Sequence, residues 1–156
     1  SEQKQYAEDL EPGTTYDLGT YEVTAEEIVD FATQWDPQDF HVDEEAARHG
    51  AFGGLIGSGL HSMAILQRLA VTRVLRGWSL IAGRSVSDVQ MTSPLRPGMT
   101  VHGVLEVEAE VEDVQHRGPE RSLVHQRLSL RHGDTTVLSF RGAAYVRRRP
   151  AGPGAD

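Results

Sequence analysis

The stretch from residue 53 to residue 75 reads GGLIGSGLHSMAILQRLAVTRVL, a glycine-rich turn that runs straight into a segment free of glycine and proline. The apolar residues of this segment surround most of the circumference of a helix. They are Leu60, Met63, Ala64, Leu66, Ala70, Val71 and Val74. A helix that is apolar on most sides is a buried one. The sequence therefore predicts a long helix over residues 60–75, inside the fold and covered by the rest of the chain.

Upstream of this helix the chain carries signals for one strand and two shorter helices. Residues 16–23 alternate enough to form a short strand. Thr24-Ala-Glu-Glu27 is a capping box, and the apolar residues after it recur at helical spacing, which predicts a helix over 25–35. Pro37 disfavours helix in the residue before it and ends this element. A second, shorter helical turn is expected over 44–49, with Asp43 as its N-cap.

Downstream, valine and leucine alternate with polar residues in four segments separated by turn signals. These segments are 79–91, 100–114, 122–131 and 135–147. Alternation of this kind predicts half-buried strands of an antiparallel sheet, arranged here as a four-strand meander. The expected fold class is α+β, with a long central helix wrapped by a curved antiparallel sheet. Such a sheet leaves open edges, and pairing of two copies would cover them, so we expect a homodimer or a higher homo-oligomer.

The composition fits one domain. The chain has 156 residues, of which 38% are hydrophobic and 24% are charged. Its formal net charge of -8 argues against nucleic-acid binding, which needs a basic face. No apolar run is long enough to span a membrane and no secretory signal opens the chain, so a cytoplasmic protein is expected. We expect a flexible lead-in over 1–15, the domain over 16–149 and a disordered tail over 150–156.

Asp36 and His41 form the first candidate chemical group, five positions apart in what is expected to be a non-helical loop. Hydration of a double bond conjugated to a thioester needs a group that orients a water and takes its proton, and a group that protonates the alpha carbon. A carboxylate and an imidazole that hold one water can do both. The alternative is that Asp36 stabilises a turn and His41 is an ordinary loop residue.

The glycine-rich turn is the second candidate group. The first N–H groups of a helix lack partners within it, and the helix dipole adds positive potential there. A thioester oxygen placed at that end would be stabilised as an enolate, and Gly59 would let the ligand approach the backbone closely. The alternative is a tight turn in which Ser58 caps the helix. The turn is not a phosphate-binding P-loop, because no Gly-Lys-Ser/Thr follows.

Taken in order along the chain, these groups and the short motifs around them form a joint pattern. The pattern consists of Asp36-Pro-Gln, Phe40-His41, Phe52-Gly-Gly-Leu-Ile, Ser58-Gly-Leu-His61 and Pro94-Leu-Arg-Pro-Gly98. It resembles the MaoC-like dehydratase family. The resemblance implies a hotdog fold and an acyl thioester of CoA or of a carrier protein as the ligand. It also implies that Asp36 and His41 activate the water and that the Gly59 N–H holds the thioester oxygen.

Some positions depart from the family pattern. Asp39 stands where a proline is usual, and its extra carboxylate is expected to raise the pKa of Asp36 or His41. Ala64 stands where some hydratases have a helpful serine, although Ser62 is close. His61 is expected to be a core or interface histidine and not a catalyst.

The function that the resemblance implies is an R-specific enoyl-CoA hydratase or 3-hydroxyacyl-thioester dehydratase. The alternatives are a non-catalytic acyl-CoA-binding module and a hotdog thioesterase. Six residues are expected to contact substrate: Gln38, Phe40, Ser58, Ser62, Arg84 and Arg96. The two arginines are candidates for contact with the CoA phosphates, and the alternative is that each is an ordinary solvated arginine. No metal site and no cofactor are expected.

Overall fold

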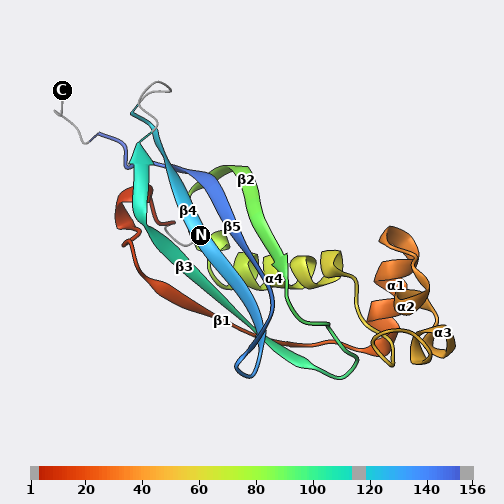
Figure 1. The fold of residues 1–156 in the computed structure, drawn as a ribbon. Coiled ribbons are helices and arrows are strands. Elements are labelled where there is room, and N and C mark those ends of the chain that lie inside the picture. Colours follow the sequence, from red (N-terminus) through yellow and green to blue (C-terminus); the bar gives the residue numbers. More distant parts are fainter. Residues whose placement is uncertain (1–3, 114–118, 152–156) are drawn as a thin grey trace.

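The structure is a computed structural model, and it describes residues 4–113 and 119–151. Two short 3-10 turns, Ala7–Asp9 and Leu75–Gly77, accompany the main elements. In chain order these are β1 (Thr15–Glu22), α1 (Ala25–Trp35), α2 (Asp39–Val42), α3 (Glu44–Arg48), α4 (Gly59–Arg73), β2 (Leu80–Met91), β3 (Thr100–Asp113), β4 (Arg121–His132) and β5 (Thr135–Arg147) (Figure 1). Within the described ranges, no helix has both the length and the apolar character needed to cross a bilayer.

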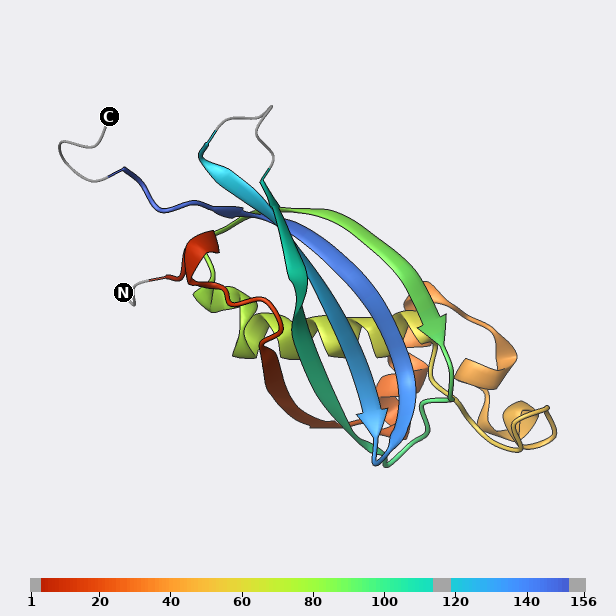
Figure 2. The same cartoon turned by 60° about the vertical axis from the view of Figure 1, so that its left-hand side comes forward.

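The five strands form one antiparallel sheet in the order β1-β3-β4-β5-β2. The predicted α+β arrangement is confirmed, because this curved sheet packs on the long helix α4 (Figure 2). The predicted four-strand meander is wrong in one respect. Only β3, β4 and β5 are successive neighbours, while β2 pairs with β5 at the opposite edge from β1. Alternation marks a strand but does not say which strand lies beside it, since pairing depends on contacts far apart in sequence.

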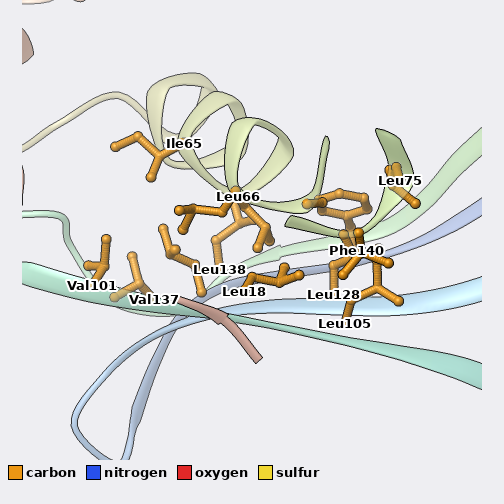
Figure 3. Packing of buried hydrophobic residues seen from close by; sticks show 14 of the residues in the cluster. Leu18, Ile65, Leu66, Leu75, Val101, Leu105, Leu128, Val137, Leu138 and Phe140 are labelled. Carbon is orange, nitrogen blue, oxygen red and sulfur yellow. The ribbon is translucent and has the colours of Figure 1, made fainter. Parts of the chain in front are cut away.

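The central helix α4 is buried on one face and not all round as predicted. Ile65 and Leu66 point from α4 into the core, toward side chains from several strands (Figure 3). Leu60 remains 50% exposed, and Ala64 also lies on the outward face. A single sheet covers one side of a helix, so the apolar residues on the opposite side have nothing to pack against within one chain.

Strand β2 is the irregular member of the sheet. Its register with β5 shifts at three places, and Asp88 adopts a positive φ of 50° at the last of them. Extra residues of this kind bend a strand and increase its twist. The outer edge of β2 has no neighbouring strand among the described residues, and four apolar side chains along it are exposed: Ile81, Val86, Val89 and Met91.

Part of the expected lead-in packs against the domain. Ala7 and Leu10 are buried in the core. The Gln5 N–H donates to the Gly77 carbonyl at 2.8 Å, and the Gln5 carbonyl accepts from Ser79 N at 2.8 Å. The chain from residue 5 is thus held beside the end of α4. The expected tail, 150–156, lies outside the described residues from 152 onward.

Replacing Leu66 tests the assigned core. Leu66 is fully buried on α4, so Leu66→Ala is expected to lower the free energy of unfolding by about 2–5 kcal/mol. Gln67→Ala, at the exposed neighbouring position, is the matched control and is expected to change it by less than about 0.5 kcal/mol. Urea unfolding followed by circular dichroism measures both. Equal effects of the two substitutions would show that the buried face of α4 is assigned wrongly.

Candidate functional site

Asp36 lies directly after α1, where Pro37 prevents the helix from continuing. Two side chains hold its carboxylate. Gln38 Nε2 donates to Oδ1 at 2.7 Å, and the Ser58 hydroxyl donates to Oδ2 at 2.7 Å. The carboxylate is therefore fixed at the junction between α1 and the start of α4.

His41 lies in the short helix α2 and is buried. The segment that contains it was expected to be a non-helical loop, and this expectation is wrong for residues 39–42. Nδ1 lies 2.6 Å from the carbonyl oxygen of Ile56, and because a carbonyl only accepts hydrogen bonds, Nδ1 carries the proton. Nε2 lies 3.3 Å from Asp36 Oδ2. With Nδ1 bonded to the Ile56 carbonyl, Nε2 is the ring nitrogen that faces the carboxylate.

The start of α4 faces the same region. Ser58 is fully buried and caps the helix, as the alternative interpretation of this turn had it, since its hydroxyl accepts from Leu60 N at 3.2 Å. Within the described residues the Gly59 N–H has no hydrogen-bond acceptor. It therefore remains available to a ligand at the positive end of the helix dipole.

The glycines of the turn also allow close packing against the loop between β2 and β3. A Cβ on Gly57 would lie 2.8 Å from Leu95 Cδ2, and the Gly57 N–H donates to the Leu95 carbonyl at 2.7 Å. A Cβ on Gly59 would lie 2.3 Å from Met91 Sδ. The space beside Gly59 was expected to let a ligand approach, but a side chain of the same chain fills it.

A cavity of about 350 Å³ joins these groups. Its volume is within the range of small-molecule sites. Among the residues singled out from the sequence, those that line it are Asp36, Gln38, Phe40, His41, Gly59 and Ser62. The lining residues that sequence reasoning did not single out as site residues include Phe52, Met91, Thr92, Val137 and Leu138.

Three predicted contact residues lie outside the cavity lining. Ser58 acts on the site through its bond to Asp36. Arg96 donates to the Phe52 carbonyl at 3.0 Å, which ties the β2–β3 loop to the glycine-rich turn. Arg84 lies on β2 away from the cavity. The structure therefore does not bring the two arginines together within one chain.

Ser62, and not Ala64, faces the cavity from the central helix, which bears on the serine that some hydratases have at the position of Ala64. Ser62 is buried and lines the cavity, whereas Ala64 is exposed on the opposite face. The polar side chain that α4 presents to the cavity is therefore that of Ser62. His61, beside it, is a core residue as expected. It stacks on Phe31 with 4.6 Å between the ring centroids, and burial lowers its pKa.

The pKa of Asp36 is lowered from its ordinary value. The largest cause is the hydrogen bond from Gln38, followed by the one from Ser58, and partial burial opposes both. The expectation that Asp39 raises this pKa is therefore wrong. Asp39 is exposed at the start of α2 and does not line the cavity. Asp36 is thus a carboxylate at neutral pH, and it and His41 Nε2 together can accept hydrogen bonds from one water.

Removing the Ser58 hydroxyl is expected to raise the pKa of Asp36 and to lower stability by about 0.5–2 kcal/mol through the lost cap. Because the folded-state pKa of Asp36 is lowered, its contribution to stability is present above the unfolded-state pKa and is lost as pH falls through the folded-state value. Ser58→Ala is expected to reduce the loss of folding stability that occurs as the pH falls. Carbon-13 NMR titration of the Asp36 carboxyl measures the pKa directly.

Thr24→Ala is the matched control for this measurement. Thr24 caps α1 by accepting from Glu27 N at 3.1 Å and does not contact Asp36. Its loss is expected to cost similar stability while leaving the titration of Asp36 unchanged. If Ser58→Ala also leaves that titration unchanged, Ser58 only caps the helix.

Comparison with known proteins finds similarity to MaoC-like proteins, both in sequence and in structure. A family model described as "MaoC like domain" matches residues 8–126. A MaoC-like dehydratase from Rhodospirillum rubrum is 35% identical, with a TM-score of 0.84 over 94% of this chain and 99% of its own. The Bacillus subtilis (strain 168) protein YdeM, described as uncharacterized, is 33% identical over 61% of this chain and 67% of its own. An (R)-hydratase from A. caviae involved in PHA biosynthesis shares the fold at 23% identity, with a TM-score of 0.71 over 92% of this chain and 100% of its own.

Proposed function

The chain belongs to the MaoC-like dehydratase family, and we propose that it is an R-specific enoyl-CoA hydratase, adding water to a trans-2-enoyl-CoA or removing it from the 3-hydroxyacyl-CoA. The proposal rests on one observation: Asp36, His41 and Gly59 line the same cavity. Asp36 Oδ2 and His41 Nε2 lie 3.3 Å apart, and the cavity that they line also reaches the free N–H of Gly59.

In the hydration direction, one water is held by the Asp36 carboxylate and by the lone pair of His41 Nε2. His41 takes a proton from this water as its oxygen bonds to the beta carbon of the enoyl group. The electron pair of the double bond shifts toward the thioester. The thioester oxygen becomes negative and accepts a hydrogen bond from the Gly59 N–H. The alpha carbon then takes a proton from the Asp36–His41 pair, the catalytic dyad of this proposal. Both residues return to their starting states, and the elements of one water have been added.

The Ile56 carbonyl has a defined role in this scheme. By accepting a hydrogen bond from Nδ1–H of His41, it keeps the lone pair on Nε2. It also stabilises the imidazolium that forms when His41 takes the proton from water. The carboxylate of Asp36 stabilises the same cation from the other side of the ring. The lowered pKa of Asp36 keeps this carboxylate charged at neutral pH.

Loss of absorbance at the conjugated enoyl-thioester band of crotonyl-CoA tests the proposal. Asp36→Asn and His41→Ala are each expected to lower kcat by about 10²- to 10⁴-fold, because each removes one partner of the water. Asp39→Asn is the matched control, since this carboxylate is three residues from Asp36 but does not line the cavity. Turnover that persists in the two dyad variants would contradict the assignment.

We also propose that the protein is a homodimer joined through the outer edge of β2, the exposed edge described above. A two-fold axis near Val86 would set two β2 strands antiparallel and bring Arg84 of each copy near Asp88 of the other, both of which lie at register shifts of β2. Val86 is 53% exposed at the centre of this edge. Opposite charges brought together across the edge favour this pairing, and the exposed side chains of Val86 and Val89 would be covered.

Arg84→Glu tests the dimer. The substitution replaces two attractive pairs with two repulsive ones, so the dimer dissociation constant is expected to rise about 10-fold, as measured by analytical ultracentrifugation at low salt. Arg131→Glu makes the same charge change on β4, away from the edge of the sheet, and is expected to have no effect. A monomeric wild-type protein, or equal effects of the two substitutions, would contradict pairing through β2.

A further inference from the structure

The cavity contains a side chain with no role in the proposed reaction, that of Met91 at the end of β2. Its thioether occupies the space where Gly59 lacks a Cβ. A Cβ built there would lie 2.3 Å from Sδ, 2.6 Å from Cε and 3.2 Å from Cγ. Met91 therefore covers the Cα of the residue whose N–H is free for the thioester oxygen.

Met91 is anchored at its backbone and free at its side chain. It is paired with Leu138 of β5, which also lines the cavity. Its side chain is nevertheless 60% exposed, and methionine has three flexible side-chain torsions and a polarizable sulfur that adapts to irregular neighbours. The Met91 side chain forms the wall of the cavity beside Gly59. This wall can shift with the side-chain torsions, while the Met91 backbone is fixed in β2.

The position of this wall matters for one part of an acyl thioester. A carbonyl oxygen bound to the Gly59 N–H lies about 3 Å from the nitrogen. The carbonyl carbon and the alpha carbon follow within two bonds of that oxygen, so they lie beside the Gly59 peptide unit. Asp36 and His41 approach from the α2 side of the cavity, and Met91 approaches from β2. A substituent on the alpha carbon therefore competes with the thioether for space.

We propose that Met91 is a specificity-determining residue that selects acyl thioesters unbranched at the alpha carbon. This inference rests on the proposed function and narrows its substrate class. Gly59 and Met91 act together, because the missing Cβ of one residue provides the space that the side chain of the other fills. Truncating Met91 opens that space to an alpha methyl group without altering the dyad.

The test compares hydration of crotonyl-CoA and 2-methylcrotonyl-CoA by wild type and Met91→Ala. The ratio of kcat/KM for the branched substrate to that for the unbranched one is expected to rise about 10-fold or more in Met91→Ala, the range expected for one added methyl group in a pocket. Met91→Phe is expected to lower the ratio. Leu60→Ala is the matched control, because Leu60 follows Gly59 and is 50% exposed but does not line the cavity.

A binding measurement separates this inference from the proposed reaction. Titration calorimetry with the unreactive thioesters butyryl-CoA and 2-methylbutyryl-CoA is expected to show the same shift in preference between wild type and Met91→Ala. If wild type hydrates crotonyl-CoA but Met91→Ala leaves both preferences unchanged, the role of Met91 is overturned and the hydratase proposal stands. If wild type neither hydrates nor binds any of these thioesters, both fall together.

Discussion

The hydroxyl group of Ser58 links the two parts of the candidate site, the Asp36 carboxylate and the first turn of α4. It donates to Asp36 Oδ2 at 2.7 Å and accepts from Leu60 N at 3.2 Å, so it fixes the carboxylate and caps α4 at the same time. Ser58 is fully buried, so its hydroxyl is shielded from bulk water. The carboxylate therefore has a fixed place relative to the helix terminus, on which the geometry of the cavity depends.

The glycine-rich turn extends this constraint to the sheet. With no side chain at Gly57, the turn approaches the β2–β3 loop closely enough for its N–H to reach the Leu95 carbonyl. The Ile56 N–H donates to the Phe40 carbonyl at 3.1 Å, and the Ile56 carbonyl accepts from His41. The turn thus holds α2 on one side and the end of β2 on the other. Figures 1 and 2 both place α1, α2 and α3 at the end of the molecule where α4 begins.

Local chemistry in the sequence predicted much of this arrangement. The caps at Thr24, Asp43 and Ser58 all accept the expected backbone N–H groups, because capping depends on residues two to three positions apart. The helix over 25–35 has the predicted bounds. The hotdog architecture was expected from the family resemblance, and the solved relatives share it.

What the sequence did not predict depends on contacts between distant segments. The placement of β2 beside β5 and the one-sided burial of α4 are set by how the sheet curls, which no local pattern encodes. Met91 escaped notice because only its approach to Gly59, 32 positions away in the chain, makes it part of the cavity. The effect of Asp39 was misjudged because sequence proximity does not fix side-chain direction, and the bonds from Gln38 and Ser58 decide the pKa of Asp36.

Incubating crotonyl-CoA with the protein in water labelled with oxygen-18 tests whether this cavity adds water to a carbon–carbon double bond. Mass spectrometry then locates the label, and chiral separation gives the configuration at the beta carbon. Hydration at this cavity gives R-3-hydroxybutyryl-CoA with one oxygen-18 on the beta carbon and an intact thioester. Label in a free carboxylic acid, with release of CoA, would identify thioester hydrolysis and contradict the account, as would recovery of unlabelled crotonyl-CoA from folded protein.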